Sequence, residues 1–375
     1  MNKVIISGWY GIPNVGAESI LTEHVNFFKQ KNSKITVLSW NPEFTKKTYD
    51  VRSKSQFSLL DVKNEIKKCD SFVLGGGDVI DDITRGLVFW MSKPWLASIL
   101  KKKVIFSTVG VKHLNYEISK KILKCMLKKC DLITVRDKYS FYMLRKLSDN
   151  KKLHLVSDSS FLLPKRYTPD VNKIIKKGKF KKKLIVSLCS SFQQKLIWSK
   201  FKIFNERKIL DIFPKLLDKL VRTYDLEVIF LPMQVSDIGD DRILYFQIMN
   251  AMENRENVKI VNNILSPEES KAVFSSGDVT LSMRFHSSIF STSSYIPTVG
   301  IGYDFSPRIE NYYNELNLHK FFININNLTP QKLFNLIELS LIEKRRIKAI
   351  LERKIKIFTD KAKYNFNLIE NTLNL

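Results

Sequence analysis

Acidic residues are scarce in this chain relative to basic ones. Its 375 residues include 37 Asp and Glu against 62 Lys and Arg, which gives a formal net charge of +25. Such a surface favours anionic partners: nucleic acid, anionic lipid or phosphorylated substrates. No nucleic-acid-binding motif accompanies the lysines, so we expect no nucleic acid partner and read much of the charge as solvated lysine.

Long apolar runs and clustered cysteines are also missing. No apolar run reaches the roughly 18 to 20 residues that a membrane-spanning helix needs. The start, Met-Asn-Lys directly followed by Val4, is too short for a signal peptide and fits a first strand. The four cysteines form no C-x-x-C pair and have no histidine beside them, as expected of reduced thiols in a cytoplasmic protein. They are Cys69, Cys125, Cys130 and Cys189.

Fixed-period repeats and low-complexity tracts are absent as well, and what the chain does contain is alternation. Short β-branched runs alternate with longer amphipathic stretches, which predicts mostly parallel sheets covered by helices in an α/β fold. In the first half we expect strands near Val4–Ser7, Ile35–Leu38, Ser71–Leu74, Val104–Ser107 and Leu132–Val135. In the second half we expect them near Leu184–Leu188, Glu227–Leu231, Val258–Val261, Val279–Leu281 and Thr298–Ile301.

The length and one interruption predict two domains. A chain of this size is long for one hydrophobic core, and the alternation stops in a Pro- and Lys-rich stretch. We therefore expect a Rossmann-like domain over residues 1–163, a linker over 164–183, a second Rossmann-like domain over 184–329 and a C-terminal helical segment over 330–375. Ligands of such sheets bind beyond the carboxyl ends of the strands.

Two glycine-containing segments follow predicted strands of the first half. In the opening loop, Gly8 to Glu18, glycines allow backbone N–H groups to approach an anion, or simply make a tight turn. In the second segment, Gly75, Gly76 and Gly77 precede Asp78, Asp81 and Asp82. These aspartates either cap the next helix, or bind sugar hydroxyls and serve as a base; no third ligand for a metal is visible nearby.

Two further strand ends carry arginine. After Leu132–Val135, Asp137 is expected to cap the following helix, whereas Arg136 binds either an anion or a carboxylate of the protein. After Val279–Leu281 come Arg284 and His286. Arginine offers a bidentate fork to carboxylate or phosphate, and imidazole exchanges a proton near neutral pH. We interpret this pair as functional rather than structural.

Taken in order, these segments resemble those of the polysaccharide pyruvyl transferase family. That family carries G-x-x-N-x-G-D-E, G-G-G, R-D-x-x-S, R-x-H and Y-D segments. The corresponding segments here begin at Gly11, Gly75, Arg136, Arg284 and Tyr303. The resemblance runs from about Met1 to Tyr313. It departs at Ala17, where the family has aspartate, at Gly110-Val111 in place of glycine-proline, and at Arg308, which replaces lysine at a longer spacing.

The resemblance implies a GT-B-like fold and a transferase that moves pyruvate from phosphoenolpyruvate onto a sugar as a cyclic ketal. It implies no metal and no cofactor, with phosphoenolpyruvate as donor substrate and a surface polysaccharide or its lipid-linked precursor as acceptor. His286 is the candidate acid, beside Arg284, and Asp78 is the candidate base, with Asp237, Asp240 and Asp241 as alternatives. The residues expected to bind substrate are Gly11, Asn14, Gly16, Glu18, Gly75, Gly76, Gly77, Arg136, Tyr303, Asp304 and Arg308.

Two other functions fit the same segments. One is a GT-B glycosyltransferase of exopolysaccharide or capsule synthesis, in which Arg284 holds the diphosphate of a nucleotide sugar. The other is a non-catalytic subunit of a polysaccharide assembly system.

The C-terminal stretch from Leu341 to Lys361 is basic, with apolar residues at helical spacing. Its apolar stripe is expected to pack on a domain. A further hypothesis is peripheral contact with an anionic membrane surface on the cytoplasmic side, which would suit a lipid-linked acceptor.

Overall fold

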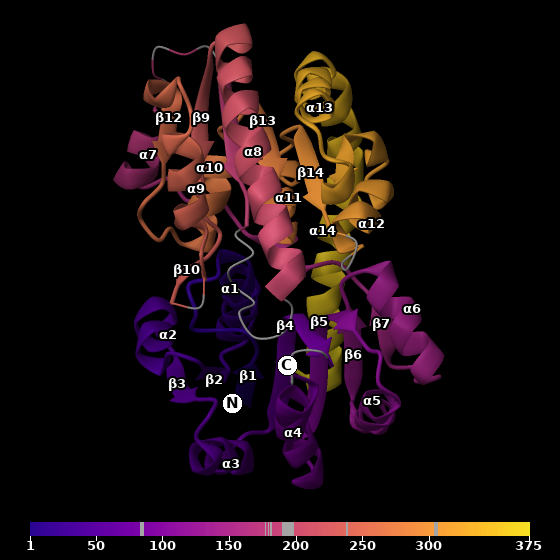
Figure 1. The fold of residues 1–375 in the computed structure, drawn as a ribbon. Coiled ribbons are helices and arrows are strands. Elements are labelled where there is room, and N and C mark those ends of the chain that lie inside the picture. The colour runs from indigo at the N-terminus through magenta and orange to yellow at the C-terminus, as the bar shows by residue number, and fades with distance from the viewer. Residues whose placement is uncertain are drawn as a thin grey trace. The chain divides into compact units, whose positions relative to one another are not determined.

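The chain divides into two compact units. The computed structural model describes residues 1–82, 86–176, 178, 180, 182–189, 199–237, 239–303 and 307–375 (Figure 1). Unit 1 consists of Met1–Ile12, Ala17–Leu163 and Ile357–Leu375, and unit 2 of Pro13–Gly16 and Pro164–Lys356. Each unit is an α/β structure built on one parallel sheet, as the alternating pattern predicts.

The sheet of unit 1 has seven strands in the order β3-β2-β1-β4-β5-β6-β7, and every neighbouring pair is parallel. Their β-branched and aromatic residues are buried, as expected of strands covered on both faces. The strands are β1 (Lys3–Ser7), β2 (Lys34–Ser39), β3 (Arg52–Ser55), β4 (Ser71–Asp81), β5 (Lys103–His113), β6 (Leu132–Val135) and β7 (Leu153–Leu155).

Two hydrophobic clusters form the core of unit 1. One contains Ile66, Trp90, Leu123 and Leu144 from α3, α4, α5 and α6. The other contains apolar residues of α1 and of the end of α14. The helices are α1 (Val15–Gln30), α2 (Pro42–Tyr49), α3 (Leu59–Lys68), α4 (Gly86–Ile99), α5 (Glu117–Lys129) and α6 (Lys138–Leu147), with a 3-10 turn, η1 (Ser159–Leu162).

The three consecutive glycines lie inside a strand, not in the loop that the sequence suggested. β4 continues through Gly75, Gly76 and Gly77 to Asp81 and pairs with β5 on the way, with register shifts after Gly77. A Cβ atom at Gly75 would lie 2.1 Å from the Tyr10 hydroxyl oxygen, and Gly77 has φ +97°. The first glycine therefore makes room for a protein side chain, and the third permits a left-handed backbone.

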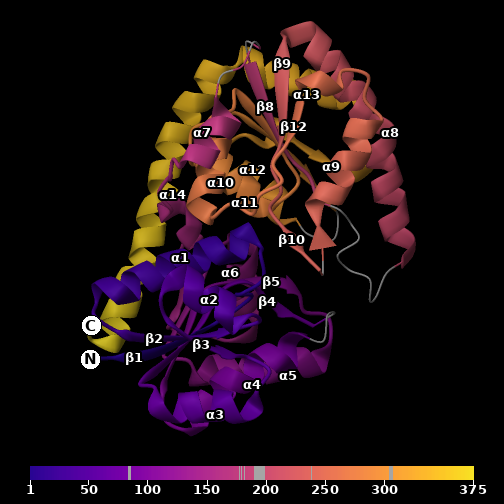
Figure 2. The same cartoon turned by 90° about the vertical axis from the view of Figure 1, so that its left-hand side faces the viewer.

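The sheet of unit 2 has six parallel strands in the order β12-β9-β8-β13-β14-β15 (Figure 2). They are β8 (Lys182–Ser187), β9 (Leu226–Phe230), β12 (Val258–Ile260), β13 (Val279–Ser282), β14 (Thr298–Gly302) and β15 (Phe322–Asn324). A two-stranded antiparallel ribbon, β10 (Val235–Ser236) with β11 (Gly239–Asp240), follows β9.

The helices of unit 2 bury their apolar faces on its sheet, with α8, α9 and α13 in one core cluster. Ser266 and Glu269 form a reciprocal capping box at the start of α10. The helices are α7 (Pro169–Ile175), α8 (Ser199–Tyr224), α9 (Asp241–Asn250), α10 (Pro267–Phe274), α11 (Phe285–Thr292), α12 (Arg308–Glu315) and α13 (Pro330–Ile342), with 3-10 turns η3 (Arg255–Asn257), η4 (His319–Phe321) and η5 (Ile325–Asn327).

One further segment differs from expectation, and another confirms it. Residues 164–183 were expected to be an irregular linker, but they contain α7, which Thr168 caps, and the start of β8. The expected C-terminal helical segment is confirmed and is divided at Glu343 into α13 and the long helix α14 (Lys344–Leu373). The apolar stripe of α14 is buried at Ile347, Leu351, Ile355 and Phe358, so it packs on the protein and does not offer itself to a bilayer.

Candidate active site

The opening loop of unit 1 is braced by its own glutamate. The two carboxylate oxygens of Glu18 accept hydrogen bonds from the backbone N–H of Gly11 (2.8 Å) and the Tyr49 hydroxyl (2.6 Å). Gly11 has φ +81°, and a Cβ there would overlap Ser39 Oγ. Burial raises the pKa of Glu18 to about 7, and the two hydrogen bonds oppose that rise. Within unit 1, Gly11 and Glu18 therefore hold the loop in shape.

Arg136 lies at the end of β6 between two carboxylates. Its Nη1 donates to Asp158 Oδ2 at 2.7 Å and its Nη2 to Asp78 Oδ1 at 2.8 Å. The side chains of Arg136 and Asp158 are each 1% exposed, whereas Asp78 is 28% exposed. Burial opposes the charge of Arg136, but the nearby aspartates outweigh it and raise its pKa. The structure thus favours a carboxylate partner for Arg136 over an anionic ligand.

The other polar residues near this strand end support the backbone. Asp137 accepts from the backbone N–H of Ser140 at 2.7 Å and caps α6, which confirms its predicted role. Asp82 accepts from the N–H groups of Asn115 and Tyr116, so it stabilises the start of α5 and not of the next helix, α4. A Cβ at Gly110 would lie 2.8 Å from Asp78 Oδ1. Gly110 thus leaves space for the Arg136–Asp78 pair.

In unit 2, residues 13–16 of the opening segment pair with the chain that follows β9. Val15 N–H donates to the Met233 carbonyl at 2.9 Å, and Val235 N–H donates to that of Pro13 at 3.0 Å. The side chain of Asn14 donates to Gln234 Oε1 at 3.2 Å. The segment that looked like a phosphate loop of the first domain is thus a structural part of the second.

Gly16 and His286 are in direct contact. His286 lies in the first turn of α11, directly after β13 and Arg284. A Cβ atom at Gly16 would lie 2.3 Å from His286 Nδ1, closer than real Cβ atoms approach. The imidazole can occupy its position only because residue 16 is glycine. Two motifs that are distant in the sequence, the one with Gly16 and the one with His286, therefore form this contact together.

Arg284 is paired with the buried carboxylate of Asp241. Its Nη2 donates to Asp241 Oδ1 at 2.5 Å, and Asp241 also accepts from the N–H groups of Met233 and Gln234. Burial raises the pKa of Asp241 against the opposing charge of Arg284. The Arg284 side chain is 17% exposed, and its buried Nε has no hydrogen-bond partner among the described residues. A guanidinium in this state can still receive an anion.

Aromatic and thiol groups complete the cluster. The Tyr303 hydroxyl lies 3.0 Å from Cys189 Sγ, and burial raises the pKa of both groups. The guanidinium carbon of Arg308 stands 5.4 Å from the centroid of the Phe285 ring, next to His286. Unit 2 therefore brings Asn14, Gly16, Arg284, His286, Tyr303 and Arg308 together, and Asp304 lies outside the described residues.

The remaining expected site residues belong to unit 1, and three residues that matter here were missed. Asp158 lies 22 positions after Arg136, whereas the sequence reading considered only its neighbour Asp137. Tyr10 fills the gap at Gly75, and Gln234 joins Asn14 to the Asp241 loop. An aromatic residue between Gly8 and Gly11 was a visible signal for Tyr10. Nothing in the sequence indicated Asp158 or Gln234.

The described residues contain no group of three or more His, Cys, Asp or Glu side chains that could hold a metal ion. Nor does this part of the chain contain a helix long and apolar enough to cross a bilayer.

The fold is that of GT-B glycosyltransferases and sugar epimerases. MnaA from S. aureus, solved with UDP, superposes with a TM-score of 0.68 at 11% identity, over 100% of this chain and 98% of that one. A UDP-GlcNAc 2-epimerase from Methanocaldococcus jannaschii gives 0.62 at 14% identity, over 92% and 94%. A glycosyltransferase from Rickettsia africae gives 0.60 at 13% identity, over 99% of both chains.

A comparison of the sequence with protein families identifies the family of this chain. The polysaccharide pyruvyl transferase family matches residues 14–305, which include Asn14, Gly16, Arg136, Arg284 and His286. The chain belongs to the polysaccharide pyruvyl transferase family and is a transferase. Among curated proteins, none matches its sequence.

Proposed function

We propose that this transferase moves the pyruvyl group of phosphoenolpyruvate onto a sugar of a surface polysaccharide, or of its lipid-linked precursor, as a cyclic ketal. The observation that carries the proposal is the Arg284–His286 pair at the carboxyl end of β13. It combines a partly exposed guanidinium that has one carboxylate partner with an imidazole two residues later. Phosphoenolpyruvate carries a carboxylate and a phosphate, which suit Arg284 and Arg308.

The residues suit the chemistry of ketal formation. A proton from His286 to the methylene carbon of phosphoenolpyruvate converts it to a methyl group and leaves an oxocarbenium ion. One sugar hydroxyl attacks this ion and loses its proton. Phosphate then leaves with the C–O bonding pair, and a second hydroxyl closes the ketal and loses its own proton. Arg284 offsets the negative charge on the departing phosphate.

Asp78 remains our candidate for accepting a hydroxyl proton. Its carboxylate is the more exposed of the two that Arg136 holds, so Arg136 orients it while leaving it open to solvent. Asp241 is a weaker candidate because its carboxylate accepts three hydrogen bonds within unit 2. Asp240 caps α9 and pairs with Arg242. Of the three aspartates Asp237, Asp240 and Asp241, Asp237 therefore has the fewest contacts among the described residues. Gly11 and Glu18 are proposed to act through the shape of the opening loop, and Gly75–Gly77 through the path of β4.

The direct test offers the purified protein phosphoenolpyruvate and nucleotide sugars in separate incubations with candidate glycans. We expect acceptor-dependent release of phosphate from phosphoenolpyruvate, and a glycan whose mass has increased by one ketal-linked pyruvate. Consumption of a nucleotide sugar with addition of a hexose would overturn the proposal in favour of a glycosyltransferase. An unchanged glycan in cells that carry His286→Ala or Arg284→Ala in place of the wild type would favour a non-catalytic subunit.

A further inference from the structure

The outer surface of α3, α4 and α5 in unit 1 is unusually apolar. These helices lie side by side over one face of the sheet (Figures 1 and 2). Of the exposed large apolar side chains in the described part of the chain, seven lie on these helices or within two residues before them. They are Phe57, Leu59, Leu60, Val88, Ile99, Tyr116 and Ile118. We call this surface, with the lysines named below, the α3–α4–α5 face.

The middle helix has no charge on its outer side. Val88, Ser92, Trp95 and Ile99 recur at helical spacing, and Val88 and Ile99 are 65% and 61% exposed. The one charged residue of α4, Lys93, is buried, with its ammonium 3.3 Å from the centroid of the Phe89 ring. A solvent-facing helix of a monomeric protein normally carries polar residues on this side.

Ring contacts join the three helices into one surface. Phe57, just before α3, stacks on Phe89 of α4 at 5.7 Å between ring centroids. Lys129 of α5 places its ammonium 5.4 Å from the centroid of the Trp95 ring of α4. The apolar side chains are therefore neighbours on a continuous face and not isolated exposures.

The flanks of this face are basic. Between Gly86 and Lys129 the chain has ten lysines and one acidic residue, Glu117, which pairs with Lys120. Beyond α5, a groove of about 510 Å³ includes Lys124, Lys128, Arg145, Lys146 and Lys152 in its lining, with Asp149 as its one acid. The exposed lysines of the face itself are Lys63, Lys67, Lys68, Lys101, Lys121, Lys124, Lys128 and Lys129. The two acidic residues of α3, Asp61 and Glu65, pair with Lys54 and Arg52.

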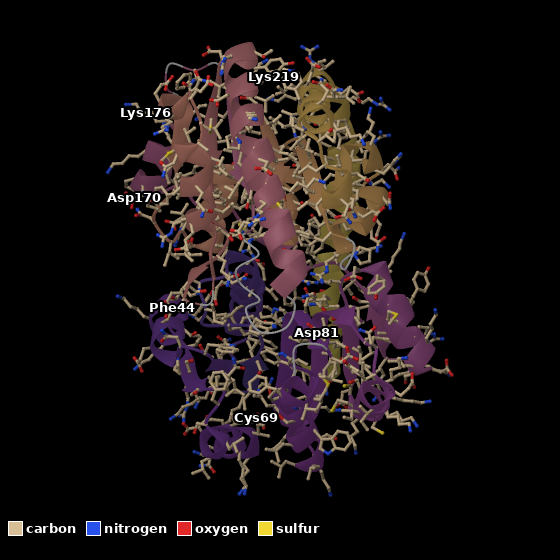
Figure 3. The ribbon with its side chains drawn as sticks, viewed as in Figure 1. Phe44, Cys69, Asp81, Asp170, Lys176 and Lys219 are labelled. Atoms are coloured by element: carbon tan, nitrogen blue, oxygen red, sulfur yellow. The ribbon has the colours of Figure 1, made fainter. Side chains whose placement is uncertain are left out.

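Most exposed apolar residues of the face lie nearer one end of the helices than most of its lysines. Leu59, Leu60, Val88 and Ile118 all lie in the first turns of their helices, whereas Lys67, Lys128 and Lys129 lie in the last turns. Ile99, at the end of α4, is the exception. In a parallel βα unit, the first turns of the helices lie at the carboxyl edge of the sheet. The apolar end of the face is thus at the edge that holds Asp78 and Arg136. Figure 3 labels Asp81 at that edge and Cys69 at the opposite end of α3.

We propose that the α3–α4–α5 face binds the surface of an anionic lipid bilayer. Exposed aliphatic and aromatic side chains enter the boundary between headgroups and acyl chains, and lysines beside them pair with lipid phosphates. A second copy of this chain is a poorer occupant, because two such faces would set lysine against lysine. The inference rests on this surface and not on the identity of the donor, so its failure leaves the proposed reaction untouched.

The test is sedimentation of the whole protein with vesicles of phosphatidylglycerol and phosphatidylcholine in equal amounts, against phosphatidylcholine alone. We expect retention by the anionic vesicles that falls as salt is raised. Val88→Glu with Ile99→Glu should lower the retained fraction at least about tenfold. The matched control is Ile264→Glu with Ile342→Glu, which changes exposed apolar residues of unit 2 that are 54% and 74% exposed.

A second variant tests the charge. Lys121→Glu with Lys124→Glu and Lys128→Glu should weaken binding by about a hundredfold, because each lysine near an anionic surface contributes a factor of about five. Lys215→Glu with Lys332→Glu and Lys356→Glu, three exposed lysines of unit 2, should change it far less. The fluorescence emission of an environment-sensitive dye on Cys125, the one exposed thiol among the four, should shift to the blue only with anionic vesicles.

Three results would overturn the proposal. The first is equal retention of the face variants and their unit 2 controls. The second is equal binding to neutral and anionic vesicles at all salt concentrations. The third is a dimer that is lost in the Val88→Glu, Ile99→Glu variant while vesicle binding is kept. The face variants should keep full activity on a water-soluble acceptor, which shows that they fold.

Discussion

The two units each place an arginine at the carboxyl end of an inner strand, but the two arginines have different surroundings. Arg136 is fully enclosed between Asp78 and Asp158, so its charge is more than neutralised. Among the described residues, Arg284 pairs with the carboxylate of Asp241, is partly exposed, and precedes His286. We therefore propose that the same residue type at the same kind of position stabilises the fold in unit 1 and takes part in the chemistry in unit 2.

Replacement of Arg136 should give the largest loss of stability. Arg136→Met leaves the buried carboxylate of Asp158 without its cation, which costs about 3–5 kcal/mol in the free energy of unfolding. Urea unfolding followed by circular dichroism measures this cost. Arg284→Lys, which keeps a cation beside Asp241, is the comparison variant and should unfold close to the wild type. Equal losses of unfolding free energy in the two variants would mean that Arg136 and Arg284 contribute equally to stability.

Replacement of His286 should affect activity and not stability. His286→Gln removes the proposed proton donor and should lower kcat by about 10²–10⁴-fold, while the unfolding midpoint stays in place. Steady-state phosphate release from phosphoenolpyruvate measures the change. His319→Gln, at an exposed position of the same unit, is the control and should retain full activity. A His286→Gln enzyme of normal rate would remove the imidazole from the mechanism.

Unit 1 should also carry a pH-dependent term in its stability. Because the pKa of Glu18 is raised from 4.5 to about 7, the folded state keeps a proton that the unfolded chain has lost between these values. The contribution of Glu18 to stability is therefore full below about pH 4.5, and up to about 3 kcal/mol of it is lost as the pH rises through 7. Glu18→Gln should flatten this slope in urea unfolding measured between pH 5 and pH 8. An unchanged slope would mean that Glu18 is ionised in the folded protein.

Glycine-to-alanine substitutions at Gly110 in unit 1 and Gly16 in unit 2 each add one methyl group, so their effects on stability and activity can be compared. Gly110→Ala presses on Asp78 and Arg136, and should cost about 1–3 kcal/mol of stability. Gly16→Ala presses on His286 and should lower kcat more than it lowers stability, since alanine is favourable in a helix. Gly178→Ala, whose Cβ would have no neighbour nearer than 3.7 Å, should change neither. A loss of activity without loss of stability in Gly110→Ala, with a loss of stability alone in Gly16→Ala, would contradict a structural role for the Arg136–Asp78 pair and a catalytic role for His286.

Much of the fold could be predicted because its signals are local. The strand at Leu132–Val135 matches its predicted bounds, and the strands expected near Val4–Ser7 and Thr298–Ile301 are found to within one residue, since the β-branched runs lie within the segments themselves. The short elements α2, β3, β7 and α7 were missed because they offer too few residues for a period.

The missed parts of the site depend on contacts between distant residues. Gly75 suggested a loop because the side chain that fills the space beside it, Tyr10, comes from another segment of the chain. The partner Asp158 of Arg136 lies beyond the next strand, and the partner Gln234 of Asn14 lies 220 residues away. Such pairs are set by strand order, which a single sequence does not display.

Binding of phosphoenolpyruvate by isothermal titration calorimetry tests the central claim most directly, in the wild type and in the Arg284→Lys and Arg136→Lys variants. A lysine keeps the charge but loses the planar fork. We predict that Arg284→Lys weakens binding at least about tenfold and that Arg136→Lys, once shown to be folded, changes it less than about twofold. Weaker binding in Arg136→Lys with normal binding in Arg284→Lys would contradict the account.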